Sequence, residues 1–145
     1  AISLYASWLY SNYGSNFIRT FAPMNPGDAK STVGGNYNSG GGTAFPINGT
    51  GNTFYTQAGY KFKNNLLGSS GTLMPYVMSQ ISKYNNFQDL MVTYDIGVNW
   101  LLKGHNSKFT LDYNNRPYFY QAVATAPITQ LARRGSLILQ YQVSF

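Results

Sequence analysis

Residues 108–116 have the sequence Lys-Phe-Thr-Leu-Asp-Tyr-Asn-Asn-Arg, which is the clearest strand signal in the chain. The large apolar residues Phe109, Leu111 and Tyr113 occupy every second position, and the positions between them hold charged, amide or hydroxyl side chains. Successive side chains of a β-strand point to opposite faces, so this spacing predicts a strand with one apolar and one polar face. We expect it to cover residues 108–119.

Five further segments show the same two-residue alternation, which predicts a strand in each of them. They cover residues 2–13, 53–63, 72–83, 91–103 and 136–145. In the fourth of these segments Asp95 alternates with Tyr94 and Ile96, so we expect its carboxylate on the polar side. The segment 72–83 has the weakest pattern, because Met74, Pro75 and Met78 blur its two faces and proline has no N–H for a ladder.

Composition selects among the all-β classes. Only 10% of the residues are charged and 17% are aromatic, whereas an ordinary globular domain has about 25% charged residues. A water-soluble sandwich normally carries many Lys and Glu on its outer face, but here the second face of each segment is mostly Ser, Thr, Gln, Asn and Gly. Such polar faces suit a wet lumen with lipid outside, so the sequence predicts an all-β, transmembrane antiparallel β-barrel, with about six strands of a larger barrel in residues 1–145.

The connections between the predicted strands alternate in length, as they do in outer-membrane barrels. A long Gly- and Asn-rich stretch, about residues 14–52, is the expected extracellular loop, and the tight turn at residues 103–106 is expected on the periplasmic side. This topology places an aromatic girdle at the two membrane interfaces. Its expected members are Trp8 and Tyr10 toward the outer rim and Phe62, Trp100, Phe109 and Phe145 at the periplasmic rim.

Two stretches of the chain resemble known proteins. The terminal strand, with Leu137, Leu139, Tyr141, Val143 and Phe145 on one face, resembles the C-terminal strand that outer-membrane proteins present to the barrel assembly machinery. The sequence from Tyr94-Asp95-Ile96-Gly97 through Asp112-Tyr113 carries a second resemblance, which covers about residues 71–145. This part of the chain is similar to the C-terminal strands of Bacteroidetes porins related to the phosphate-selective porin O and P family. This resemblance implies a large channel of many strands, a homotrimer, and small anionic or polar solutes.

Six strands are too few for a bacterial single-chain barrel, since these begin at about eight. We therefore expect the chain to be the C-terminal portion of a single barrel domain whose remaining, N-terminal strands are its main partner. The alternative is that several copies share one barrel. The other expected partner is outer-membrane lipid, which implies a location in the bacterial outer membrane.

Charged residues on the polar positions are the candidates for lining the pore. They are Lys61, Lys63, Asp95, Lys103, Lys108, Asp112 and Arg116. Positive charges outnumber negative ones in this set, and rings of Lys or Arg in a pore favour anions. The alternative is that opposite charges on neighbouring strands neutralise one another.

Other functions are less well supported by the sequence. His105 is the sole histidine, and with Ser107 nearby it forms no recognisable triad, so we expect no enzyme. The glycine-rich residues 34–42 lack the Lys-Ser or Lys-Thr of a phosphate-binding loop. No cysteine is present, and we expect no metal and no cofactor. Basic and aromatic residues mostly fall on opposite faces, which argues against nucleic acid as a partner.

Two functions therefore remain open. The first is a porin through which small polar or anionic solutes diffuse passively. The second is an outer-membrane barrel that transports nothing and acts as a scaffold in a surface or secretion complex. Its partners would then be the other proteins of that complex.

Overall fold

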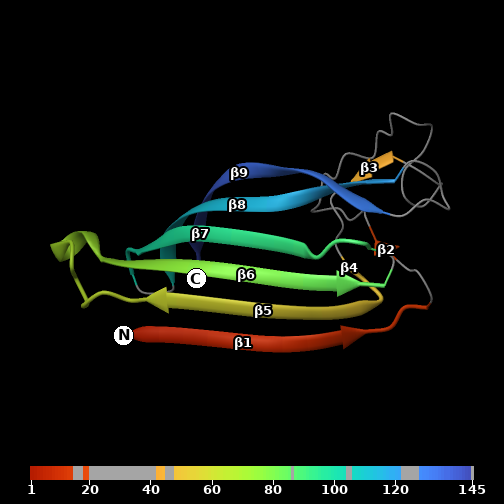
Figure 1. Ribbon diagram of the computed structural model, residues 1–145. Helices are drawn as coiled ribbons and strands as arrows, with labels where there is room; N and C mark the ends of the chain where they lie inside the picture. The colour runs from red at the N-terminus through yellow and green to blue at the C-terminus, as the bar shows by residue number, and fades with distance from the viewer. Residues whose placement is uncertain are drawn as a thin grey trace.

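The chain folds into one antiparallel sheet built on six long strands, shown in the computed structural model of Figure 1. The structure describes residues 1–14, 18–19, 42–44, 48–85, 87–103, 106–121 and 128–144. In spatial order the long strands are β1 (Ile2–Ser11), β5 (Gly51–Tyr60), β6 (Thr72–Tyr84), β7 (Met91–Leu101), β8 (Ser107–Gln121) and β9 (Thr129–Val143). The all-β class and the six antiparallel strands predicted from alternation are confirmed.

Shorter elements lie in the connections. β2 (Ile18–Arg19) pairs with β4 (Asn48–Gly49), and a 3-10 turn η1 (Gly68–Ser70) lies between β5 and β6. β3 (Gly42–Ala44) pairs with residues 119–121 of β8, beyond the point where β7 stops pairing with β8. The end of the sheet with η1 and the β7–β8 connection is called the turn end here, and the opposite end, with the β6–β7 connection, the loop end.

The last strand is longer than its sequence predicts. β9 begins at Thr129 rather than at residue 136, and it pairs with β8 along nearly all of its length. Residues 129–135 have no clean alternation of apolar and polar residues, so periodicity alone gave no signal there. Backbone pairing with the long strand β8 extends β9 instead. The pairing continues past a register irregularity at Tyr118 and Phe119 of β8. The predicted strands 2–13, 53–63 and 91–103 end two or three residues early, at Ser11, Tyr60 and Leu101.

Pro75 lies inside β6 without interrupting it. Its partner on β7 is Val98. The ladder between β6 and β5 ends at the pair Tyr76 and Gly59, so Pro75 lies just outside that ladder. Proline cannot donate to a ladder, and it is tolerated where one side needs no donor. The weakest of the six strand predictions is therefore confirmed for a specific reason.

The pairing register divides the side chains into two faces, because directly paired residues point to the same side of a sheet. The polar face, as we define it, contains Gln57, Tyr76, Asp95, Asn99, Lys108, Thr110, Asp112, Asn114, Arg116, Ser136 and Gln140. The apolar face contains Ile2, Leu4, Trp8, Phe54, Val77, Ile81, Ile96, Val98, Leu111, Tyr113, Leu137 and Leu139.

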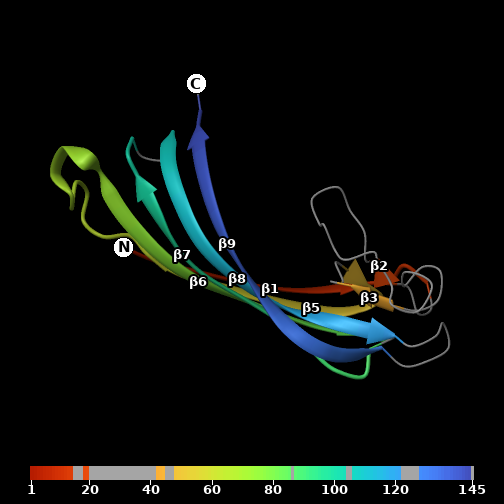
Figure 2. The same cartoon turned by 90° about the horizontal axis from the view of Figure 1, so that it is seen from above.

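Exposure is the reverse of that in a water-soluble sheet. On the apolar face Leu4 is 77% exposed and Leu139 73%, whereas Asp95, Asp112 and Arg116 on the polar face are half-buried. Figure 2 shows that the sheet is strongly curved. Side chains converge on the concave side of a curved sheet and diverge on the convex side, so we infer that the polar face is the concave one.

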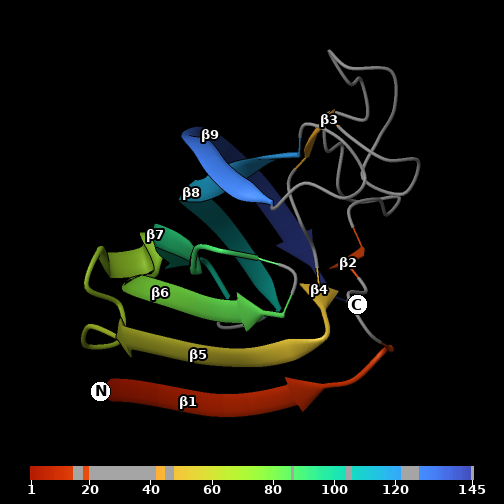
Figure 3. The ribbon, with the colours of Figure 1, turned by 45° about the vertical axis from the view of Figure 1, so that its right-hand side comes forward.

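The two outermost long strands have free edges. Among the described residues β1 pairs only with β5, and β9 pairs only with β8. Figure 3 shows β1 at one side of the curved sheet and β9 at the other. The sheet is therefore open along both of these strands.

A small buried cluster holds the loop end together. It consists of Tyr84, Phe87, Met91, Phe119 and Ile128, none of them more than 3% exposed. Phe87 stacks on Phe119 with ring centroids 4.4 Å apart, and it also forms a bridge with Ile128. The carboxylate of Asp89 accepts a hydrogen bond from the backbone N–H of Gln130 at 2.9 Å. The β6–β7 connection is thus fastened to the start of β9.

Replacing Phe119 with alanine tests this cluster. Phe119 is fully buried, so we expect Phe119→Ala to lower the free energy of unfolding by about 3–5 kcal/mol, through lost burial and the cavity left behind. Urea unfolding of the protein in detergent or lipid measures this change. Leu90→Ala is the matched control, because Leu90 lies in the adjoining connection but is 52% exposed. Equal losses in the two variants would contradict the role of the cluster.

Candidate functional site

The polar face brings charged residues of two neighbouring strands together. Asp95 of β7 pairs with Asn114 of β8, and Asp112 of β8 pairs with Gly97 of β7. The two carboxylates are therefore diagonal neighbours near the middle of the sheet. Lys108 and Arg116 share their face on β8, on either side of Asp112. The face that the sequence predicts for these four residues agrees with the observed register.

Neutral groups hold both carboxylates. The Tyr76 hydroxyl donates to Oδ2 of Asp112 at 2.5 Å, and the Asn114 side-chain amide donates to Oδ1 of Asp95. Beside them the Thr110 hydroxyl donates to Oδ1 of Asn99 at 2.6 Å. Arg116 also attracts the Asp95 carboxylate electrostatically. Mutual neutralisation of opposite charges on neighbouring strands therefore stays a prediction for this pair.

Tyr76 reaches Asp112 by lying across an intervening strand. It is on β6, Asp112 is on β8, and Gly97 of β7 lies between them. A Cβ atom added at Gly97 would be 2.6 Å from Cζ of Tyr76, so only glycine leaves room for the ring there. Sequence reasoning did not include Tyr76 among the site residues. A glycine inside a strand, which marks close approach of another group, was the available signal.

A hollow of about 250 Å³ lies on the polar face around these groups. Its lining residues are Tyr55, Gln57, Tyr76, Met78, Asp95, Thr110, Asp112, Ile138 and Gln140. The Tyr55 hydroxyl donates to Oε1 of Gln57 at 2.7 Å, and its ring meets that of Tyr5 edge to face at 5.8 Å. The middle of the polar face is therefore an ordered array of hydroxyl, amide and carboxylate groups.

Basic residues lie toward both ends of the polar face. At the turn end, Lys61 follows β5 by one residue, and Lys63 and Lys103 are exposed residues outside the long strands. At the loop end, Arg134 of β9 pairs directly with Arg116 of β8, and its guanidinium lies 4.9 Å from the ring centroid of Tyr118. Arg134 was missed as a pore-lining candidate because the sequence predicted a connection, rather than a strand, before residue 136.

Aromatic residues of the predicted girdle collect at the turn end. Trp100 and Phe109 have ring centroids 6.0 Å apart, and Phe109 stacks on Tyr141 at 4.5 Å. The Trp100 indole N–H donates to the Ser70 carbonyl at 2.5 Å, and Phe62 meets Tyr60 edge to face at 5.0 Å. Tyr141 joins this group although the prediction did not list it as a girdle residue.

Toward the loop end, Trp8 and Tyr10 lie on β1, and their side chains are 68% and 53% exposed. Some predicted features fall outside the described residues. They are Phe145, His105 and most of residues 34–42.

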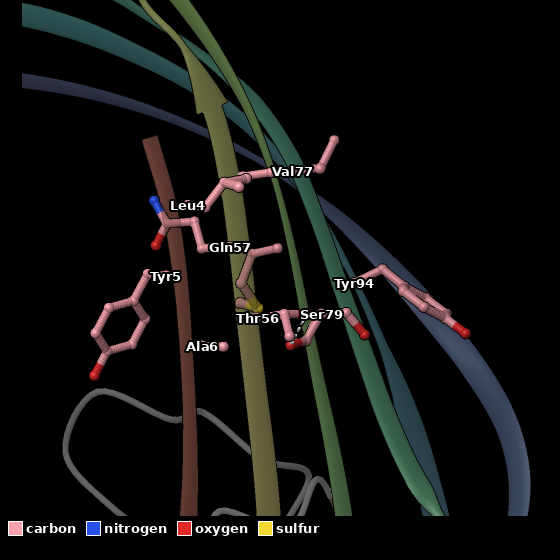
Figure 4. A pocket seen from close by; sticks show the side chains of 10 residues that line it. Leu4, Tyr5, Ala6, Thr56, Gln57, Val77, Ser79 and Tyr94 are labelled. Carbon is pink, nitrogen blue, oxygen red and sulfur yellow. Dashed lines mark hydrogen bonds between the residues drawn. The ribbon is translucent and has the colours of Figure 1, made fainter. Parts of the chain in front are cut away.

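The apolar face has a separate hollow of about 660 Å³, shown in Figure 4. Leu4 and Val77 border it, and the small side chains of Ala6, Thr56 and Ser79 form its floor in one row across three strands. The Thr56 hydroxyl is 3.5 Å from the Ser79 carbonyl, the hydrogen bond drawn in Figure 4. No charged side chain lines this hollow, so it lacks the carboxylate groups that line the hollow on the polar face.

None of the His, Cys, Asp and Glu side chains of the described residues form a group of three that could hold a metal ion. None of their helical segments has the length and hydropathy that a membrane-spanning helix needs.

Comparison of the chain with protein-family models, with curated proteins and with solved structures found no match. The candidate site therefore stands on its own geometry.

Gly97→Val tests the contact between Tyr76 and the strand that it crosses. The new side chain would overlap the ring, so we expect a loss of about 1–3 kcal/mol in the free energy of unfolding, as in other overpacked sites. Urea unfolding measures the loss. In a Tyr76→Ala background the same substitution should cost less, because only the overlap with the backbone oxygen of Leu111, 2.8 Å from the added Cβ, remains. Ala58→Val, at the apolar hollow, is the control. Equal costs with and without Tyr76 would exclude this contact as the cause.

Proposed function

We propose that this sheet is part of a transmembrane β-barrel of the bacterial outer membrane, through which small polar or anionic solutes diffuse passively. The observation that carries the proposal is the reversed exposure of the sheet. Large apolar side chains are exposed along one face, while carboxylates, amides and a guanidinium are half-buried on the other. Lipid outside and a water-filled lumen inside satisfy both faces at once.

A water-soluble arrangement would leave this apolar face uncovered. Sandwiches bury the apolar faces of two sheets against each other, but no second layer lies on this sheet in the part of the chain that the structure describes. Monomeric soluble proteins rarely expose apolar patches of more than a few hundred Å². Hydrocarbon is the solvent in which such a face is stable.

The free edges of β1 and β9 support a larger barrel. In hydrocarbon each unpaired N–H or C=O costs several kcal/mol, so spanning strands require neighbours on both sides. We propose that further strands of the same barrel pair with β1 and β9. A barrel shared by several copies of this chain is the alternative, and the mass of the intact polypeptide on a denaturing gel distinguishes the two.

The arrangement of the ends supports an orientation. Trp100, Phe109 and Tyr141 would lie at the periplasmic interface, where aromatic rings are enriched, next to the short β7–β8 connection. The long connection between β1 and β5 would then be extracellular. The resemblance of residues 94–113 to porins of the phosphate-selective O and P group supports a pore, and it extends the proposal to a homotrimer.

Conductance of the intact protein in a planar lipid bilayer tests transport. We expect stepwise current increases as single pores insert, and a zero-current potential in a salt gradient that indicates a preference for anions, because basic residues outnumber Asp95 and Asp112 on the polar face. A sealed lumen, together with proteins that remain bound through purification, would instead support the scaffold role.

Cysteine labelling tests the two faces independently of conductance. The chain has no cysteine, so a single one can be placed at Leu139 or at its neighbour Gln140. In proteoliposomes, Gln140→Cys should react rapidly with a charged, water-soluble thiol reagent because it faces the lumen. Leu139→Cys should react only after unfolding, because hydrocarbon surrounds it. Equal reaction rates at the two positions would contradict a membrane-embedded sheet.

A further inference from the structure

Charges on the polar face alternate in sign along β8. Lys108, Asp112 and Arg116 are four residues apart and share one face. A strand rises about 3.3 Å per residue, so neighbouring charges of this series are about 13 Å apart along the strand. An ion that moves along this wall therefore meets a positive, a negative and then a positive charge.

Neighbouring strands add residues of the same charge near each of these three positions, and each group of like charges is called a level here. Asp95, the diagonal neighbour of Asp112, adds a second carboxylate at mid-height. Arg134 is directly opposite Arg116 and adds a second guanidinium toward the loop end. Lys61, Lys63 and Lys103 lie at the turn end of the sheet, where Lys108 is the second residue of β8. The acidic level, Asp95 and Asp112, thus separates two basic levels.

The hydrogen-bond donors that hold the acidic level are neutral groups. Tyr76 and Asn114 orient the two carboxylates without cancelling them, and Gly97 provides the space for Tyr76. At physiological salt the Debye length is about 8 Å, shorter than the separation of about 13 Å between Asp112 and the basic residues on either side of it. Asp95 pairs with Asn114 and so lies only about 7 Å along the strand from the height of Arg116, which makes Asp112 the better separated of the two carboxylates.

We propose that Asp95 and Asp112 determine specificity in this pore, by forming a cation-attracting level that every anion must cross between the two basic levels. This inference rests on the proposed function, since it needs a conducting lumen. It implies that the pore prefers anions less than its excess of basic residues would suggest. It also implies that removing the two carboxylates strengthens the anion preference without closing the pore.

The test is the anion-to-cation permeability ratio of the intact protein, measured as a zero-current potential in a KCl gradient around 0.15 M. Asp95→Asn and Asp112→Asn should each raise the ratio about 1.4-fold, the size of the attraction between unit charges about 8 Å apart in water after screening over one Debye length. The double variant should raise it about twofold. Asparagine retains an oxygen that accepts from Tyr76 or Asn114, and either single variant serves if the double one does not fold.

Asp89→Asn is the matched control, since it removes the same charge from the β6–β7 connection at the loop end. Its ratio should stay close to that of the unmodified protein. If the Asp95 and Asp112 variants conduct normally and have the same permeability ratio as the unmodified protein, the proposed role of the two carboxylates is wrong and the proposed function is unaffected. A protein that never conducts overturns both.

Discussion

Antiparallel backbone pairing between each strand and its neighbour, from β5 through β6, β7 and β8 to β9, is the constraint on which the other features depend. The register that pairs Asp95 with Asn114 also places every other charged residue of β7 and β8 on the same side. A slip by one residue would turn Asp112 toward the face that carries Leu137 and Leu139. The half-buried polar wall and the exposed apolar wall are thus two results of one hydrogen-bond pattern.

Side-chain hydrogen bonds connect strands across the polar face. Tyr76 crosses β7 at Gly97 and fixes Asp112, while Asn114 fixes Asp95 from the neighbouring strand. These contacts tie β6, β7 and β8 together through side chains as well as through backbone ladders. The two carboxylates are therefore held at defined positions along the sheet.

Much of this arrangement could be predicted from alternation, and the exceptions have physical causes. Residues 108–116 predict their strand and both of its faces because every second side chain is large and apolar. Arg134 was missed, since residues 129–135 become a strand through pairing with β8 rather than through their own pattern. The cluster around Phe119 was missed because it depends on how the β6–β7 connection packs against β8 and β9. The hydrogen bond from Tyr76 was missed because its ring must cross β7 at Gly97 to reach β8.

The free edge of β1 also affects how the protein reaches its folded state. Residues 2–11 expose unpaired backbone groups next to Leu4 and Trp8, which makes this strand a template for uncontrolled association in water. In the barrel proposed above, this edge stays uncovered until a further strand pairs with β1. Association through the open edge would therefore compete with closure of that barrel.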